Sequence, residues 1–182
     1  MSRARYDRLV DKGFFDSDDR LELLDGLLVA RERQTPLHAA ATGIARDALE
    51  RAFGSRYHAR SQTPIALDDA SEPEPDVAVV PGRPLDYLDA HPSTAALVIE
   101  VADESLSKDR LLKAPLYARA GIADYWIVNL IDEVLEVYRD AVRAPSRRYG
   151  WKYESVRLLK RGARLSPLAA PRSRIRVADL LP

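Results

Sequence analysis

The stretch AALVIEVA, residues 95–102, places one carboxylate inside an otherwise apolar run. Its length and its β-branched residues indicate a strand, and a strand that is apolar on both faces belongs inside a sheet covered on both sides. Because side chains alternate along a strand, Glu100 shares a face with Val98, opposite Leu97 and Ile99. An ionised carboxylate there is costly unless a cation or a proton compensates it. Glu100 is therefore expected to be metal-bound, catalytic or paired, and a structural salt bridge is the simplest alternative.

A second carboxylate stands at the start of another apolar run. In the stretch ASEPEPDVAVV, residues 70–80, Asp76 directly precedes Val-Ala-Val-Val. Pro73 and Pro75 keep the approach extended, since proline fixes its own φ and biases the residue before it away from helix. The 24 positions from Asp76 to Glu100 leave room for one strand, a connection and a return strand. The two carboxylates are therefore expected to meet at one end of adjacent strands.

The neighbouring acids Glu72 and Glu74 alternate with the prolines, and the sequence names no partner for either. We expect both to be loop acids. An acidic surface loop throughout is the alternative to a placed metal ligand at Asp76.

Two carboxylates with open positions for water and substrate phosphate are the usual way of holding Mg²⁺ (or Mn²⁺), because Mg²⁺ keeps several of its waters. Hydrolysis of a phosphodiester also needs a cation near the attacking water and the developing charge. Lys113 is the candidate, because it lies one helix beyond Glu100 on a leucine-rich helix that should pack against the sheet. Lys108 competes, but its ESLSKD neighbourhood is typical of an exposed helix start, where a lysine is solvated.

Turn and periodicity signals predict the other elements. Asp25-Gly26 indicates a β-hairpin within RLELLDGLLVARE, because this dipeptide tolerates the positive φ of a tight turn. Thr35-Pro36 indicates the N-cap and first residue of a helix that Gly54 ends. A short helix is expected at residues 6–12, and extended segments or strands at residues 57–69, 76–81, 124–130, 133–140 and 148–159.

Helical spacing predicts which residues of two helices face a core. In the helix from Thr35 to Gly54, the residues that recur at this spacing are Leu37, Ile44, Ala48 and Leu49. In SLSKDRLLKAPLYARAGI, residues 105–122, the residues expected toward a core are Leu111, Leu112, Leu116 and Tyr117. Pro115 inside this pattern costs about 3 kcal/mol in a continuous helix, so a kink or a restart near Lys113 is expected.

The length of 182 residues suits one domain, residues 1–182, of the α/β class with an α+β mixed sheet. Apolar residues make up 46% and charged residues 31%, and no apolar stretch approaches the ~20 residues that cross a bilayer, so a membrane protein is not expected. The N-terminal stretch has no apolar core typical of a secretory signal. There is no cysteine, and a cytoplasmic location is the default expectation.

The net charge is zero, but the charges are segregated along the chain. From Met1 to Tyr138 there are 16 Lys and Arg against 25 Asp and Glu, whereas from Arg139 to Pro182 there are 12 against 3. Aromatic residues are interleaved with the arginines of this basic C-terminal quarter, a mixture that suits contacts with phosphates and stacking on bases. A solvated surface that neutralises the acidic part is an equally good interpretation.

Taken together, the motifs resemble a known family. The string LELLDG, TPLH, SEPEPDVAVV, LVIEVADESLSKDRLLKAPLYARAGIADYWIVNL and LEVYR, from Leu21 to Arg139, resembles the Uma-type family of restriction endonucleases, a branch of the PD-(D/E)XK nuclease superfamily. The resemblance implies a restriction-endonuclease-like core, with a central mixed β-sheet flanked by helices, an N-terminal β-hairpin and a metal-dependent phosphodiesterase centre. Pro75-Asp76 matches the family's PD, and Glu100 matches the acid of its second motif.

The match departs from the superfamily pattern at the lysine, which should stand two residues after the glutamate, where this chain has Ala102. The Uma-type pattern has a lysine farther on, and Lys113 fills that place as a migrated equivalent. Glu22 corresponds to the family's acid in the N-terminal hairpin, while Leu27 stands where a second acid often follows the turn. His38 matches a recurrent histidine at a helix start, where a helix-end or packing role is favoured over a base. Gln62 is a weaker candidate still.

The leading hypothesis is a metal-dependent endonuclease that hydrolyses DNA phosphodiester bonds. Asp76 and Glu100 would bind Mg²⁺ (or Mn²⁺), Lys113 would orient or activate the attacking water, and Glu22 would assist. The alternatives are a catalytically inactive nucleic-acid-binding module of the same fold and a structural or regulatory oligomer in which Asp76, Glu100 and Lys113 form only a buried ion cluster. A small domain that cuts both strands needs two active sites, so a homodimer is expected.

Overall fold

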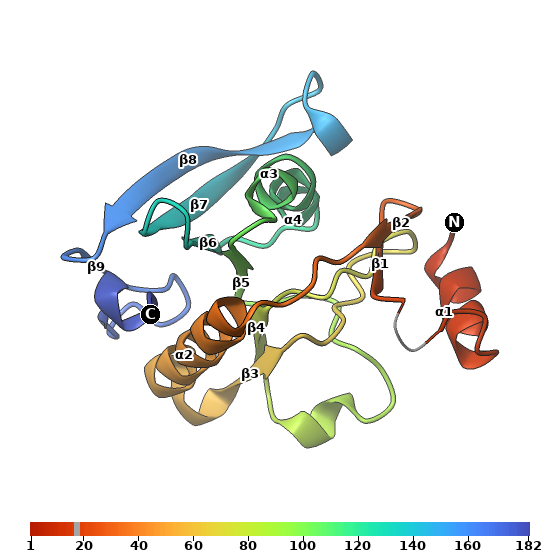
Figure 1. Cartoon of the computed structure of the whole chain (residues 1–182), viewed down its shortest axis with the longest axis horizontal. Helices are drawn as coiled ribbons and strands as arrows, with labels where there is room; N and C mark the ends of the chain where they lie inside the picture. The colour runs from red at the N-terminus through yellow and green to blue at the C-terminus, as the bar shows by residue number, and fades with distance from the viewer. Residues whose placement is uncertain (17–18) are drawn as a thin grey trace.

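In the computed structural model, which describes residues 1–16 and 19–182, six strands form a mixed central sheet (Figure 1). The strands lie in the order β3-β4-β5-β6-β7-β8. Their bounds are β3 Tyr57–Ser61, β4 Val77–Pro81, β5 Leu97–Ala102, β6 Tyr125–Asn129, β7 Val134–Arg143 and β8 Trp151–Lys160. Every residue of β5 is buried, so the predicted apolar strand and its interior position are confirmed.

The only parallel neighbours among these six strands are β5 and β6, and the other pairs are antiparallel. Parallel strands need a long crossover connection. Here it consists of α3 (Leu106–Lys108), a π-helical turn η3 (Asp109–Lys113) and α4 (Ala114–Arg119). Glu100 lies near the end of β5, so the crossover that follows can bring a side chain back over it.

The two faces of the sheet carry separate cores. On the face covered by α2 (Pro36–Phe53), Leu97 and Ile99 of β5 join one apolar cluster (Figure 1). On the face covered by α4, Val98 and Ala102 join the other. This confirms the alternation predicted for β5 and puts Glu100 on the crossover side, together with Val98. The mixed sheet flanked by helices is the predicted fold class.

Helix α2 begins and ends as predicted but packs differently. The Thr35 hydroxyl accepts a hydrogen bond from the His38 backbone N–H at 3.1 Å, and Gly54 ends the helix with a φ of 66°. Two of the residues expected at helical spacing, Leu37 and Ile44, are 50% and 36% exposed. Ala48 and Leu49 are buried as predicted, and Ala41 and Ala45 complete the buried stripe, because these small side chains let the helix lie close to the sheet.

The crossover also corrects one predicted core residue. Leu116 and Tyr117 are fully buried, but Leu111 is 67% exposed. The π-helical turn accommodates one extra residue per turn, so it shifts the helical phase and turns Leu111 outward. The expected restart is confirmed, since α4 begins at Ala114 and Pro115 occupies its first turn.

The N-terminal hairpin lies beside the central sheet rather than within it. Strands β1 (Leu21–Leu24) and β2 (Leu27–Ala30) pair through the predicted turn, where Asp25 and Gly26 have φ values of 50° and 80°. Positive φ at both turn residues matches the twist of the hairpin, as Asp-Gly turns require. A β-bridge between Leu23 and Glu72 ties the hairpin to the loop that leads into β4.

The remaining elements lie near the ends of the chain and between strands. Helix α1 spans Arg3–Asp11, and β9 (Arg164–Leu165) pairs with β10 (Ile175–Arg176). Short 3₁₀ turns are η1 Gly54–Arg56, η2 Pro84–Tyr87, η4 Arg148–Gly150 and η5 Val177–Asp179. Among the described residues, no helix combines the length and apolar character needed to cross a membrane.

A buried carboxylate, Asp124, fastens the C-terminal segment to the sheet. Its side chain accepts hydrogen bonds from the Trp126 indole at 2.7 Å, from Arg139 at 2.8 and 3.2 Å, and from the Leu168 backbone N–H at 2.8 Å. Asp124 is fully buried. The charge is therefore paired and hydrogen-bonded, as a buried charge must be.

We expect Asp124→Asn to lower the free energy of unfolding by about 3 kcal/mol, because it leaves the half-buried Arg139 without its partner. Urea denaturation checks this through the midpoint at constant slope. The exposed Asp47→Asn is the matched control and should change stability by less than about 0.5 kcal/mol. Equal losses in the two variants would contradict the anchoring role.

A second buried acid makes stability depend on pH. Burial alone would raise the pKa of Glu136, but hydrogen bonds from Arg110, Tyr138 and Asn129 outweigh it and lower the pKa below its usual value. A depressed pKa contributes stability above the unfolded value of about 4.3, and this contribution is lost as pH falls through the folded pKa.

Glu136→Gln should therefore be less stable than the parent at pH 7, and the difference should be smaller at pH 3, because below the unfolded value of about 4.3 the unfolded parent takes up a proton that the folded Glu136 resists. Urea denaturation at the two pH values measures this. Glu104→Gln, a change at an exposed acid, is the control and should track the parent. A difference that stays constant between pH 7 and pH 3 would contradict the assignment.

Candidate active site

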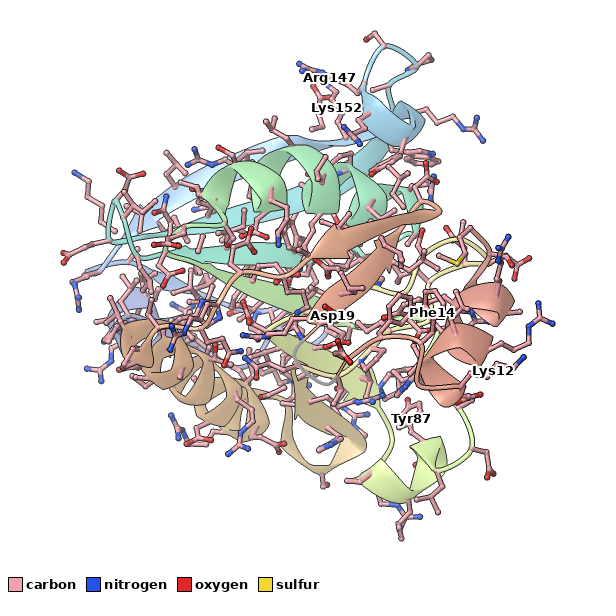
Figure 2. The ribbon with its side chains drawn as sticks, turned by 45° about the vertical axis from the view of Figure 1, so that its right-hand side comes forward. Lys12, Phe14, Asp19, Tyr87, Arg147 and Lys152 are labelled. Carbon is pink, nitrogen blue, oxygen red and sulfur yellow. The ribbon has the colours of Figure 1, made fainter. Side chains whose placement is uncertain are left out.

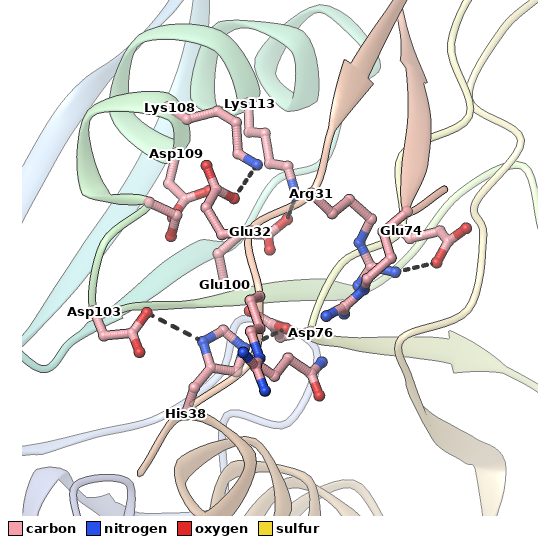
Figure 3. Close-up of a pocket in the computed structure, with 14 residues that line it drawn as sticks. Arg31, Glu32, His38, Glu74, Asp76, Glu100, Asp103, Lys108, Asp109 and Lys113 are labelled. Atoms are coloured by element: carbon pink, nitrogen blue, oxygen red, sulfur yellow. Dashed lines mark hydrogen bonds and ion pairs between the residues drawn. The ribbon is translucent and has the colours of Figure 1, made fainter. Parts of the chain in front are cut away.

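The antiparallel pairing of β4 with β5 brings Asp76 and Glu100 to one edge of the sheet. Val77 is paired with Ile99, so one step further along the register sets Asp76 opposite Glu100. Both side chains line the same pocket, which Figure 3 shows between β5, α2, the crossover and the hairpin. The structure thus brings together the two carboxylates predicted to meet at the ends of adjacent strands.

The Asp76 carboxylate is held from two sides. One oxygen, Oδ2, accepts a hydrogen bond from the Val101 backbone N–H at 2.8 Å, and Oδ1 lies 2.8 Å from Nε2 of His38. Asp76 is only 6% exposed. These contacts fix the orientation of the Asp76 carboxylate, which follows the extended segment through Pro75.

The Glu100 carboxylate is anchored through a single oxygen. Its Oε1 accepts hydrogen bonds from Lys113 Nζ at 3.0 Å and from the Tyr117 hydroxyl at 2.7 Å. Glu100 is 3% exposed, and its Oε2 makes no hydrogen bond to a described residue. Oε2 is therefore the atom of Glu100 that remains for a ligand in the pocket.

Lys113 reaches the site because the π-helical turn directs it inward. Its Nζ lies 3.0 Å from Glu100 and 3.2 Å from Oε2 of Glu22, and the side chain is 4% exposed. Asp109, one π turn earlier, is also buried. The predicted lysine is thus in the site, on the helix beyond Glu100, although Ala102 stands at the usual superfamily position.

Glu22 comes to the site from β1 and is fully buried. Its Oε2 accepts a hydrogen bond from the Glu74 backbone N–H at 3.2 Å and contacts Lys113. Its Oε1 lies 3.7 Å from Lys108 Nζ and makes no hydrogen bond to a described residue. Glu22 therefore joins the hairpin to the crossover helix.

The ionisation of these groups follows from burial and mutual contact. Burial raises the pKa of Glu100 to about 8, against the pull of Lys113. Burial also raises the pKa of Asp109 to about 6. Lys113 behaves in the opposite way: burial alone would lower its pKa, but the carboxylates of Glu100, Glu22, Asp109 and Asp76 outweigh burial and raise it. The lysine therefore stays charged, and the site holds more acidic groups than buried cations.

His38 contacts the site more closely than predicted. It lies in the first turn of α2, as expected for a helix-start residue, but its ring connects Asp76 with Asp103, whose Oδ1 lies 3.5 Å from Nδ1. Burial would lower the pKa of His38, but the hydrogen bond with Asp76 and the charges of both acids raise it. Gln62 does not line the pocket; its backbone N–H bonds the carbonyls of Pro75 and Asp76.

Three charged residues differ from the sequence predictions. Lys108 is not solvated, since its side chain is 12% exposed and pairs with Glu32 and Glu22. Glu74 has a partner, Arg31, and both line the pocket. Glu72 is buried and lies 3.9 Å from Arg3. Their partners are distant in the sequence, so no local signal could have found them.

The mouth of the pocket is basic. The segment that follows β2 contributes Arg31, Glu32, Arg33 and Gln34 to its lining, and Arg20 precedes β1. Sequence reasoning did not single out this segment. Its only signal is the run Arg-Glu-Arg-Gln between the hairpin and the α2 N-cap. Cations around an acidic centre suit a ligand that is itself anionic.

The donor set can be tested against a metal ion. Within residues 1–16 and 19–182, no three or more His, Cys, Asp or Glu side chains form a ready-made metal cluster. The two carboxylates, Asp76 and Glu100, border a cavity of about 30 Å³, room for an ion or a water molecule. This set does not suit Zn²⁺ with four protein ligands. It fits a hard ion such as Mg²⁺, which takes its other ligands from water and phosphate.

Comparison with known proteins agrees with the motif resemblance. The Uma2 family, described as "Putative restriction endonuclease", matches residues 3–178. A crystal structure of "a putative nuclease" from Anabaena variabilis ATCC 29413 has the same fold, with a TM-score of 0.71, 13% sequence identity and coverage of 99% of this chain and 97% of that chain. No curated protein matches in sequence. Because the family match spans nearly the whole chain, this protein belongs to the Uma2 family.

Proposed function

We propose that this protein is a metal-dependent endonuclease that hydrolyses DNA phosphodiester bonds. The observation that carries the proposal is the buried group of Asp76, Glu100, Lys113 and Glu22 at one edge of the central sheet. Membership of a restriction-endonuclease family supports a nuclease-like function. Mg²⁺ (or Mn²⁺), when bound, would polarise the phosphate and lower the pKa of a bound water.

Asp76 and Glu100 would hold the ion. Asp76 is oriented for this by Val101 and His38, and Glu100 presents Oε2 while Oε1 is held by Lys113 and Tyr117. Prior orientation matters because a metal ligand that must reorganise loses affinity, and such supporting contacts typically contribute 10- to 100-fold. His38 is thus a positioning residue in this proposal.

Lys113 would orient the attacking water or stabilise the charge that develops on the phosphate. Its ammonium stays protonated in the site, so it acts as a fixed positive charge rather than as a base. Glu22 keeps the ammonium in place from the hairpin side. A preorganised charge in a site closed to solvent is worth more than the same charge in water.

A second candidate function is nucleic-acid binding without turnover, on the same fold. The contacts of Lys113 favour this function, because an ammonium that is already paired with two carboxylates has less positive charge to offer a phosphate. Under a third reading these residues are only a buried ion cluster. The three readings differ in what divalent ions do to the protein, which makes metal binding the decisive property.

A homodimer is part of the proposal, because two sites are needed to cut both strands of a duplex. β3 and β8 are the two edge strands of the six-stranded sheet in the described chain. Light scattering after size exclusion measures the mass against the 20.4 kDa of one chain. Linear plasmid that accumulates faster than independent nicking of the two strands allows would be the catalytic counterpart.

Cleavage is expected to depend on the carboxylate pair and the lysine. With supercoiled plasmid and 5 mM Mg²⁺ or Mn²⁺, Asp76→Ala and Lys113→Ala should each lower the rate of nicking by at least about 100-fold, since each removes a group that acts on the transition state. Chelator should abolish nicking by the parent. Lys12→Ala, at an exposed position beyond α1, is the matched control. Nicking by the site variants at the parent rate would refute the assignment.

Metal binding should raise the free energy of unfolding. If the ion binds only the folded protein, Mg²⁺ at ten times its Kd adds about 1.4 kcal/mol to the free energy of unfolding. Asp76→Asn should lose this increment while keeping the hydrogen bond from Val101. The metal-free variant should be at least as stable as the parent, because one of several crowded carboxylates is gone. A less stable variant, with no effect of Mg²⁺ on the parent, would favour the ion-cluster reading.

A further inference from the structure

A second pocket lies on the outer side of the crossover, away from the candidate active site. It has a volume of about 280 Å³ and lies between the crossover helices and the β7–β8 hairpin. Figure 2 shows Arg147 and Lys152 together at the tip of this hairpin. The residues that argue for a ligand are Tyr138, Arg147, Arg148, Trp151, Lys152 and Tyr153. None of the residues that line it lines the first pocket.

The wall of this pocket is aromatic and apolar. Tyr138 and Tyr153 are 8% and 6% exposed and lie edge to face, with ring centroids 6.0 Å apart. Pro115 and the exposed Leu111 face them from the crossover side. Trp151, half-buried at the start of β8, has the Arg143 guanidinium over its ring at 5.4 Å from the centroid, and Arg143 does not line the pocket. The pocket therefore offers a ring-lined surface on which a flat group can stack.

The rim is strongly positive. Arg110 is paired with Glu136, and Lys152 lies 2.6 Å from Glu154. Arg147 and Arg148 have no ion pair with any described residue, and Arg148 lies over the Tyr149 ring at 5.3 Å. Two uncompensated guanidinium groups beside an aromatic wall match a ligand that is both flat and anionic.

We propose that this pocket binds an unpaired nucleotide of the substrate strand, with the base against Trp151 and the phosphate between Arg147 and Arg148. A base inside a duplex is stacked on both faces and cannot present a face to Trp151, whereas an unpaired base can. Cations alone would bind any phosphate, so the aromatic wall is what selects the unpaired form. This deepens the proposed function, because it names the form of the substrate.

The pocket also accounts for a feature of the sequence that is not part of the candidate active site. Arg147, Arg148 and Trp151 belong to the basic C-terminal quarter, in which arginines alternate with aromatic residues. The crossover joins the two pockets, since Lys113 points to the first and Arg110 and Leu111 line the second. The two pockets are therefore lined by neighbouring residues of one helical segment.

The test measures binding without cleavage. A fluorescein-labelled 20-nucleotide single strand is titrated in EDTA and followed by anisotropy, so its result does not depend on turnover. Arg147→Ala/Arg148→Ala should weaken binding at least about tenfold and lower the salt slope by about 0.7, the value for one phosphate contact on a single strand. Trp151→Ala should weaken binding at least about fivefold.

The matched control is Arg164→Ala/Arg172→Ala, which removes the same charge from exposed positions of the same quarter. It should weaken binding less than about threefold, and circular dichroism should show all variants folded. Equal losses in the two double variants would overturn the pocket in favour of diffuse attraction. Tighter binding of a matched hairpin duplex than of the single strand would overturn the unpaired form.

Tryptophan emission gives an independent readout. The chain has two tryptophans, and Trp126 is fully buried in the other core cluster. An unlabelled oligonucleotide should quench the emission of the parent, whereas Trp151→Phe should lose the quenching. Unchanged parent emission during binding would overturn stacking on Trp151. Free dAMP that competes as well as the oligonucleotide would overturn the assignment to a strand.

Discussion

The buried ammonium of Lys113 is the contact on which the arrangement of the site depends. It lies between Glu100 of the central sheet and Glu22 of the N-terminal hairpin, at 3.0 and 3.2 Å, and so joins three segments that are distant in the sequence. Burying these charges is costly, and only their close mutual contact offsets the desolvation. The position of the hairpin and the charge of the site are therefore linked: a hairpin that moved away would leave an uncompensated charge on both sides.

The crossover helix makes this contact by departing from regular helical geometry. A continuous α-helix with this leucine pattern would turn Leu111 inward, whereas the π-helical turn exposes Leu111 and buries Asp109 and Lys113. The turn thus loses the burial of one leucine side chain and places two charged groups at the end of β5. Departures from the local rules at such places are typical of functional sites.

The parts of the fold that follow local rules could be predicted from the sequence. The hairpin at Asp25-Gly26, the extents of α2 and β5, and the meeting of Asp76 with Glu100 all follow from turn chemistry, capping and strand alternation. The role of His38 beside Asp76 could not be predicted, because nothing near it in the sequence identifies a partner 38 residues away. The π-helical turn could not be predicted for a related reason: its only local sign is Pro115, which marks a break but not its geometry.

The segregation of charge along the chain has a physical consequence for the proposed binding of nucleic acid. Carboxylates grouped for a metal ion repel the phosphates of the same ligand, and this repulsion acts over roughly the Debye length of 8–10 Å at ordinary salt. The acidic centre contains Asp76 and Glu100, while Arg147 and Arg148 lie on the far side of the crossover. Under the proposed function, one surface would attract the nucleic acid and another would carry out the hydrolysis. A bound divalent ion would then need to neutralise only the acidic centre. Under the proposed function, the basic quarter would supply the binding energy that the acidic centre cannot, so a net charge of zero is compatible with binding of a polyanion.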